Sequence, residues 1–355
     1  MKTYKFLAVA LIATGVFSAC TNDPVVQPVK RSDPAEISFR LQGGTPEITT
    51  RSSATTLLDV DAFAVFGIDD LADNGGAGAN IMHGVTVARQ VGGFFDYSPK
   101  KYFSEGAADA QFFAYSPVSA IQHITNLPAA TSSAYTGASF DFKVVKPSTS
   151  GKISQVDLLV AGSSVEVTTT PVDLQFTHAL SRVFVKAVNE LNDDIVITNL
   201  KLLNLKSDGK LTGTAVTASD PADPWTWAWA PIASSTTNFE YVLAPTGVAL
   251  KAGAGKGSPN VPILVTSMEQ GMLVLPQKTV NNNGPDDASA GDFALEVTYD
   301  LVDLIGETAY IYLTHDYEFK MNQQYAITIT FSGSTRIVID FEIDVDDFNN
   351  ILDLP

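Results

Sequence analysis

The chain has 355 residues, of which 45% are hydrophobic and 17% are charged, and its formal net charge is −17. This apolar content excludes a wholly disordered chain, and the length suits two domains of ordinary size. The acidic balance and the lack of a Lys/Arg cluster argue against nucleic-acid binding, which needs a basic face for phosphate. A single cysteine excludes internal disulfides and sites built from several thiolates.

The N-terminal residues have the order of a secretion signal. Two lysines precede an apolar run over residues 6–17, which is too short to span a bilayer comfortably. Two small residues stand directly before Cys20, as in a bacterial lipobox whose cysteine receives lipid after cleavage. We therefore expect a signal peptide over residues 1–19 and attachment of Cys20 to outer-membrane lipid, with a free or buried thiol as the alternative.

A tether, a strand and a polar loop follow in that order. Residues 21–34 contain three prolines and no apolar period, which indicates a flexible tether. Three apolar residues then alternate with polar ones, so that they share one face of a strand: Ile37, Phe39 and Leu41. The loop over residues 43–53 has Arg51 and Ser52 near its far end, and exposed polar loops of this kind are where proteases cut.

The rest of the chain predicts an all-β protein. Apolar residues recur mostly at every second position, as Val183 and Val185 do, which places them on one face of a strand. Turn-forming breaks such as residues 281–285 separate these runs. Short strands at this spacing favour β-sandwiches, and a Thr-rich stretch that ends at Pro171 favours two domains, over residues 52–170 and 171–355.

The last strand pattern is the longest. It has five apolar residues at alternate positions, with acidic neighbours in its second half: Ile337, Ile339, Phe341, Ile343 and Val345. The segment is either the final strand of its own domain or a strand offered to another chain. Alternation alone leaves both interpretations open, because it does not specify the partner.

A stripe of three tryptophans lies between two prolines. Trp225, Trp227 and Trp229 alternate, so on a strand their rings share one face. Such a stripe is either a platform on which sugars stack or part of a core or interface, where aromatic rings are most often buried.

No other motif predicts chemistry. The histidines at 83, 123, 178 and 315 lack metal-ligand spacing, and residues 253–258 lack the full phosphate-loop pattern. The acidic pairs Asp69-Asp70 and Asp346-Asp347 are interpreted as solvated turn or edge charges. The sequence has no nucleophile elbow. We therefore expect no metal, no cofactor and no enzymatic activity.

Several phrases along the chain resemble the fimbrillin family, the subunits of the type V pili of Bacteroidales. They are YSPKKYF at 97–103, FFAYSP at 112–117, DLLVA at 157–161, LQFTHALSR at 174–182 and LPQ at 275–277. The resemblance implies two tandem transthyretin-like β-sandwich domains that polymerise on the cell surface after a protease removes the first strand.

Applied to this chain, the resemblance makes residues 20–51 a lipidated pro-segment that is cut between Arg51 and Ser52. The strand with Ile37 would leave with it, and a strand of a neighbouring pilin subunit would fill its place, with residues 337–345 as the candidate donor. The expected partners are neighbouring subunits, the processing protease, outer-membrane lipid and receptors on host or bacterial surfaces. The alternative is an anchored lipoprotein that binds a glycan or host ligand without polymerising.

Overall fold

A computed structural model describes most of the body of the protein. It covers residues 35–41, 60–69, 78–129, 138–146, 155–167, 170–215, 225–241, 243, 246–255, 262–266, 271–279, 292–312, 317–333 and 338–347. All of these belong to one compact unit, residues 34–355. Cys20, Arg51, Ser52 and Ile337 lie outside the described residues, so lipidation and cleavage stay predictions.

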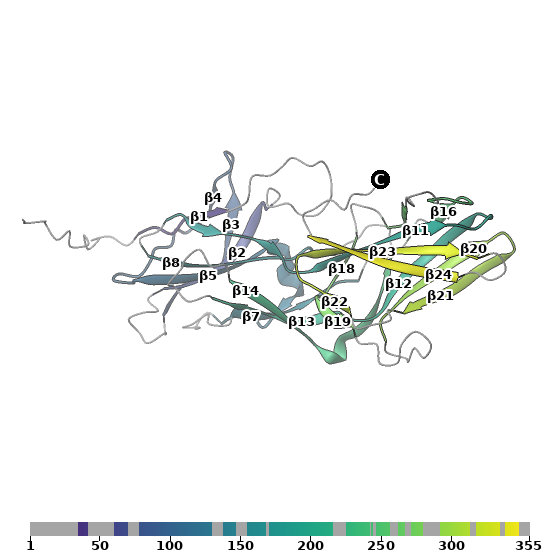
Figure 1. The fold of residues 1–355 in the computed structure, drawn as a ribbon. Helices are drawn as coiled ribbons and strands as arrows, with labels where there is room; N and C mark the ends of the chain where they lie inside the picture. Colours follow the sequence, from purple (N-terminus) through teal and green to yellow (C-terminus); the bar gives the residue numbers. More distant parts are fainter. Residues whose placement is uncertain are drawn as a thin grey trace, which may run out of the picture. The chain divides into compact units, whose positions relative to one another are not determined.

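The predicted all-β class is confirmed (Figure 1). Apart from the strands, the described residues contain only two short 3-10 helices, η2 (Val118–His123) and η3 (Ala233–Ser235). No helix in this part of the chain is long and apolar enough to cross a membrane.

The first half of the body is built on a six-stranded sheet with the order β10-β8-β5-β2-β3-β4. Its strands are β2 (Ala62–Asp69), β3 (Ala79–Arg89), β4 (Phe95–Asp96), β5 (Asp109–Ser116), β8 (Leu159–Glu166) and β10 (Thr177–His178). Phe63 and Val65 belong to one core cluster and Phe66 to another, so strand β2 is buried on both faces. The period-two pattern with one buried face, predicted for much of the chain, does not apply to β2.

A different layer covers each face of this sheet. On one face lie β1 (Phe39–Leu41) and β9 (Val172–Leu174), and the Phe39 and Phe112 ring centroids are 5.5 Å apart. On the other face lies a four-stranded sheet with the order β14-β13-β7-β6, and the Phe113 and Phe140 centroids are 5.6 Å apart. Its strands are β6 (Ile124–Thr125), β7 (Ala138–Lys143), β13 (Asp208–Thr214) and β14 (Thr226–Pro231).

Two five-stranded sheets form most of the second half. The first has the order β17-β11-β23-β24, and β18 also pairs with β11. Its strands are β11 (Ser181–Asn189), β17 (Ile263–Leu264), β18 (Met272–Val274), β23 (Gln323–Ser332) and β24 (Val338–Asp347). Strand β11 runs parallel to β23 and is buried along its whole length, as a central strand covered on both faces is.

The second of these sheets has the order β15-β12-β20-β21, and β16 also pairs with β12. Its strands are β12 (Ile195–Lys206), β15 (Thr236–Tyr241), β16 (Val248–Leu250), β20 (Ala294–Leu301) and β21 (Leu304–Tyr312). Tyr299 of β20 meets Phe331 of β23 edge to face at 5.2 Å, so the two sheets share a core. A separate ladder joins β19 (Gln277–Thr279) to β22 (Tyr317–Phe319).

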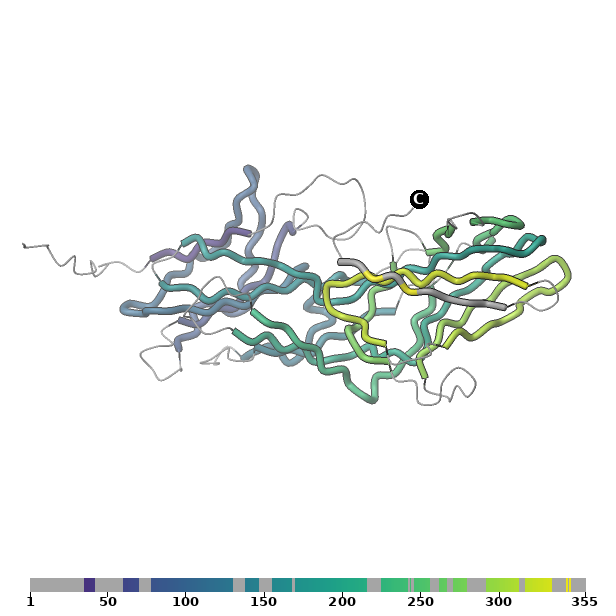
Figure 2. The backbone as a smooth tube through the Cα atoms, in the orientation of Figure 1, coloured from purple at the N-terminus to yellow at the C-terminus, as the bar shows by residue number. Residues whose placement is uncertain are grey.

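Strand pairing crosses the predicted domain junction at Pro171 in three places. Strand β9 pairs with β1, β10 pairs with β8, and β13 pairs with β7. The tube in Figure 2 shows the β13–β14 hairpin (green) beside the strands of the first half. The division into domains at residues 170 and 171 and the transthyretin-like topology stay predictions.

Candidate functional site: the groove that holds the first strand

The segment over residues 35–41 pairs through its backbone with two different parts of the chain. In its first half, the Ile37 amide donates to the Lys101 carbonyl at 3.0 Å, and the Phe103 amide donates to the Ala35 carbonyl at 3.1 Å. In its second half, β1 runs parallel to β9, with Phe39 opposite Val172. The segment lies in a groove formed by β9, residues 97–103 and the sheet face beneath them. We call it the first-strand groove.

Two apolar side chains of this segment point into the groove. Ile37 is 0% exposed and Phe39 is 5% exposed, whereas Leu41 is half-buried. The Phe39 ring meets Phe63 edge to face at 5.9 Å and Phe112 at 5.5 Å. Burying a side chain of this size contributes about 1.5–3 kcal/mol, so the packing of these two side chains is a substantial part of what holds the segment.

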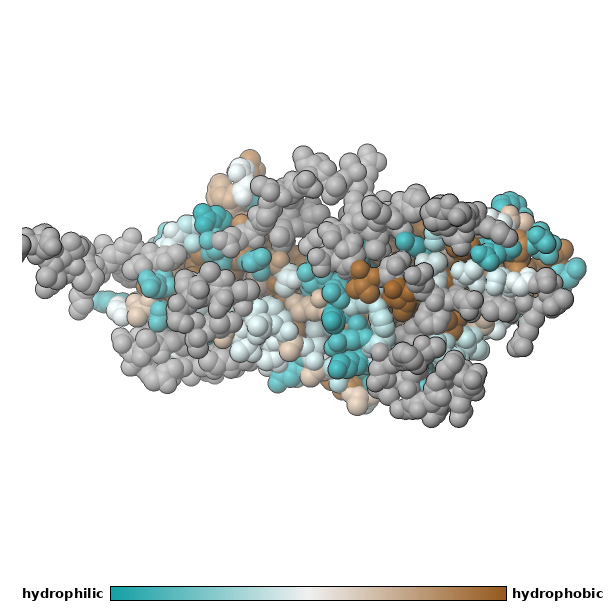
Figure 3. All heavy atoms as spheres, viewed as in Figure 1, coloured by the Kyte–Doolittle hydropathy of each residue, from teal (hydrophilic) through white to brown (hydrophobic). Residues whose placement is uncertain are grey.

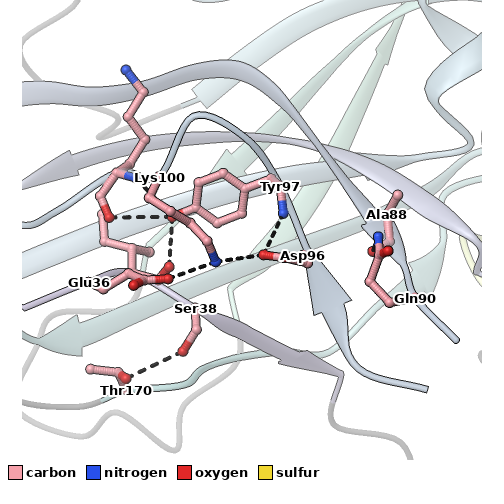
Figure 4. Close-up of polar contacts among 10 residues, drawn as sticks. Glu36, Ser38, Ala88, Gln90, Asp96, Tyr97, Lys100 and Thr170 are labelled. Carbon is pink, nitrogen blue, oxygen red and sulfur yellow. Dashed lines mark hydrogen bonds and ion pairs between the residues drawn. The ribbon is translucent and has the colours of Figure 1, made fainter. Parts of the chain in front are cut away.

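Tyr97 and Lys100 form one rim of the groove (Figure 4). The Tyr97 hydroxyl donates to the Ile37 carbonyl at 2.6 Å, and burial raises the pKa of Tyr97. The Lys100 ammonium lies over the Tyr97 ring, 5.3 Å from its centroid, and contacts Glu36 at 2.7 Å and Asp96 at 2.6 Å. The hydrogen bond from Lys100 lowers the pKa of Asp96, so both groups stay charged at neutral pH.

Asp173 of β9 forms the other rim. Arg40 donates to its carboxylate with two nitrogens, Nε to Oδ1 at 2.7 Å and Nη2 to Oδ2 at 2.8 Å. This hydrogen bonding raises the pKa of Arg40, although the guanidinium itself is exposed. Between the two charged contacts, the Ser38 and Thr170 hydroxyls lie 3.4 Å apart (Figure 4).

Asp69 supports the groove from behind, and its interpretation as a solvated turn charge is wrong. It is 0% exposed and accepts hydrogen bonds from the Ser104 amide and, at 2.8 Å, from the Ser104 hydroxyl. These bonds anchor the end of the 97–103 segment to strand β2. The sequence gives no signal for this contact, because the two residues are 35 positions apart.

The last strand, β24, pairs antiparallel with β23 of its own chain, from Gln323 opposite Asp347 to Ser332 opposite Val338. Ile339 and Phe341 take their places in this ladder. The side chain of Ile343 packs against the core, and that of Val345 is 48% exposed. In this structure, the candidate donor strand therefore pairs with a strand of its own chain. Its use by another chain stays a prediction.

The tryptophan stripe packs inward. Trp225 is 5% exposed, and a Cβ atom placed on Gly162 would lie only 2.1 Å from its ring. Trp227 and Trp229 are half-buried, and the Trp229 indole donates to the Ala179 carbonyl at 2.7 Å. Glycines leave room for two of the rings, Gly162 for Trp225 and Gly213 for Trp227. The sugar platform stays a prediction, with only the outer parts of two rings open to solvent.

His178 is the buried histidine of the site's neighbourhood. Its Nδ1 lies 3.0 Å from the Asp157 carboxylate. Within the described ranges, no group of three or more His, Cys, Asp and Glu side chains is arranged to hold a metal ion.

Large exposed apolar side chains gather at two turns of the described chain. Val91 and Phe94 lie between β3 and β4, Val302 lies between β20 and β21, and Ile305 lies at the start of β21. The β3–β4 turn stands out from the surface in Figure 3, and it leads directly into the rim of the first-strand groove. Exposed apolar groups of this kind are typical of protein contact surfaces.

Comparison with known proteins gives the family. Residues 50–345 match the sequence profile described as fimbrillin-like. The structure of a fimbrial protein from Bacteroides vulgatus aligns with a TM-score of 0.60 at 16% identity, over 88% of this chain and 99% of that one. No curated protein matches the chain.

Two further structures are more distant. A protein from Bacteroides uniformis with a suggested cell adhesion role aligns with a TM-score of 0.48 at 17% identity, over 88% of this chain and 99% of that one. The tip fimbrial protein Mfa3 from Porphyromonas gingivalis, truncated at its C-terminus, gives 0.38 at 10% identity, over 80% and 93%. Because the profile match spans most of the sequence, the chain belongs to the fimbrillin-like family.

Proposed function

We propose that the protein is a structural subunit of a cell-surface fimbrium, and that it polymerises when its first strand is exchanged for a strand of a neighbouring subunit. Membership of the fimbrillin-like family supports the general role in fimbriae or adhesion. One observation supports the exchange: a short apolar segment fills a groove without being part of the sheet that it covers.

The strand pairing favours departure of this segment as a unit. The ladder of β1 with β9 is a two-stranded one, separate from the six-stranded sheet. Removing residues 35–41 breaks the bonds at the groove edges and leaves the pairing of β2, β5 and β8 in place. We therefore expect the six-stranded sheet to keep its register after the first strand has left.

The energetics favour refilling of the groove. The three apolar side chains Ile37, Phe39 and Leu41 together contribute roughly 4–8 kcal/mol, because Leu41 is only half-buried. That is a sizeable part of the ~5–15 kcal/mol by which a typical domain is stable. An empty groove exposes Phe63 and Phe112 to water, so an incoming strand with the same alternation is strongly favoured.

The proposed cut has two consequences at once. Arg51 and Ser52 stand between the end of β1 at Leu41 and the start of β2 at Ala62. A cut there separates the first strand from the rest of the chain, and it also separates the subunit from Cys20 and its lipid. Release from the membrane and opening of the groove are then coupled, with a surface protease as the partner that triggers both.

The mature N-terminus of assembled fibres tests this function. We expect fibres sheared from cells to begin at Ser52, and Arg51→Ala to leave uncut subunits on the membrane. Arg31→Ala is the matched control, because a cut after Arg31 would leave the first strand attached. Fibres whose subunits begin at Cys20 would contradict the exchange.

The same experiment separates the alternative function. A lipoprotein that binds a glycan or host ligand without polymerising would keep its first strand and form no fibres. Glycan binding that is lost in Trp227→Ala, with an unchanged melting temperature, would favour that alternative.

A further inference from the structure

The two rims of the first-strand groove carry opposite charges. Lys100 contacts Glu36 at one end, and Asp173 contacts Arg40 at the other. We propose that these two rim charges select the strand that enters the groove in the direction of β1. The favoured strand has an acidic residue at the place of Glu36 and a basic residue at the place of Arg40. This inference rests on the proposed exchange and names the partner more narrowly.

The inward-facing positions of the groove discriminate poorly between different incoming strands. Any strand with alternating large apolar residues offers side chains for the places of Ile37 and Phe39, and cores tolerate apolar swaps of similar volume. The outward places meet charged groups that are held in position from outside the first strand. Lys100 is held by Asp96 and by the Tyr97 ring, and Asp173 is held in register by β9. Opposite charges at such places give specificity.

The last strand of this same chain does not fit the two rims. Entering in the direction of β1, it has three alignments that fill the inward places with apolar residues. The place of Glu36 then falls to Arg336, Val338 or Asp340, of which only Asp340 suits Lys100. The place of Arg40 falls to Asp340, Glu342 or Asp344, so every alignment sets a carboxylate against Asp173 and none suits both rims. No basic residue follows Arg336 in the sequence. The groove is therefore poorly matched to a second copy, and we infer that a different subunit supplies the strand.

The expected selectivity is moderate. Both contacts are partly open to solvent, and an exposed ion pair changes an equilibrium constant by about 2- to 5-fold. Reversing both charges replaces two attractions by two repulsions, so we expect roughly a 10-fold loss of affinity at low salt. The difference shrinks as salt is added, because exposed charges are screened.

Competition among peptides tests the inference. The full chain is cut once at Arg51–Ser52 in vitro, and a labelled peptide of residues 35–42 is exchanged into the groove. Three competitors are compared: the native peptide, the same peptide with Glu36→Lys and Arg40→Glu, and a peptide of residues 337–347. We expect the native peptide to compete about 10-fold better than the charge-reversed one at low salt, and better than the last-strand peptide.

A matched protein variant separates charge from packing. In the cut chain with Asp173→Lys, a peptide with Arg40→Glu alone should regain binding, while the melting temperature of the chain stays near that of the wild type. Equal competition by native and charge-reversed peptides would overturn the selectivity and leave the exchange intact. Failure of every peptide, the native one included, would overturn the exchange itself.

Discussion

The first and last strands of the body look alike in sequence and are held in different ways. Strand β1 pairs over three residues with β9, and Phe39 and the preceding Ile37 are buried in the core. Strand β24 pairs with β23 along its whole length, and Val345 near its end is half exposed. The backbone ladder of β1 therefore has three residue pairs, whereas that of β24 has ten. Alternation in a sequence reports a buried face, and it does not report the length of a strand's backbone ladder or its partner.

Truncation of Phe39, the central apolar side chain of the first strand, should have the largest effect on stability. Phe39→Ala removes the ring that packs on Phe63 and Phe112, and we expect a loss of about 3–5 kcal/mol from the free energy of unfolding. Urea denaturation of the uncut chain measures it. Ser38→Ala, which changes an outward residue of the same strand, is the control and should stay within about 0.5 kcal/mol. A loss below about 1 kcal/mol for Phe39→Ala would mean that the backbone contacts hold the strand.

Loss of the support behind the groove should have a smaller and local effect. Asp69→Asn weakens the acceptor for the Ser104 amide and hydroxyl, at a cost of about 1–3 kcal/mol. Hydrogen exchange should quicken at the amides of Ile37 and Phe103, which bond to the adjoining segment. The amides of the β23–β24 ladder are the internal control, and equal quickening there would show a general loss of stability.

The hydroxyl of Tyr97 should contribute less than Asp69 does to the stability of the groove. Tyr97→Phe keeps the ring and removes the donor to the Ile37 carbonyl, which is worth about 0.5–1.5 kcal/mol. In the cut chain, release of the first strand should speed up about 2- to 10-fold, as followed by loss of a label on residues 35–42. An unchanged release rate would leave the hydroxyl without a role in holding the strand.

Alkaline pH should produce the smallest change. Burial raises the pKa of Tyr97 from its ordinary value of 10.0, and burial followed by the charge of Tyr325 raises that of Tyr317 to about 12. A tyrosine with a raised pKa keeps its proton longer in the folded chain. Its contribution to stability is present below pH 10 and is lost as the pH rises through the folded value. Ultraviolet titration should therefore show tyrosines ionising above pH 10, together with a fall in melting temperature.

Tyr97→Phe tests whether ionisation of Tyr97 is what releases the first strand at alkaline pH. The variant should remove the part of the alkaline response that follows release of the first strand, and leave the part that arises near Tyr317 and Tyr325. A strand release that is equally sensitive to alkali in the variant would assign the response to another residue.

The sequence predicted the class of fold and the face of the first strand, because both follow from period-two alternation. It did not predict that β2 is buried on both faces, since an unbroken apolar run is compatible with more than one packing. The two supports of the groove that lie farthest from it in sequence, Asp69 and Asp173, carry no local signal. Their roles follow from the folded structure, in which β2 and β9 both lie at the first-strand groove.

The sharing of a sheet between the two halves of the body bears on how the halves are held together. Six consecutive residue pairs join β13 to β7, from Asp208 opposite Lys143 to Gly213 opposite Ala138. The chain leaves this ladder at residue 143 and returns to it at residue 208, so backbone hydrogen bonds join the two halves in addition to the chain itself. Backbone pairing thus ties the two halves of the body together in a chain whose single cysteine provides no internal covalent cross-link.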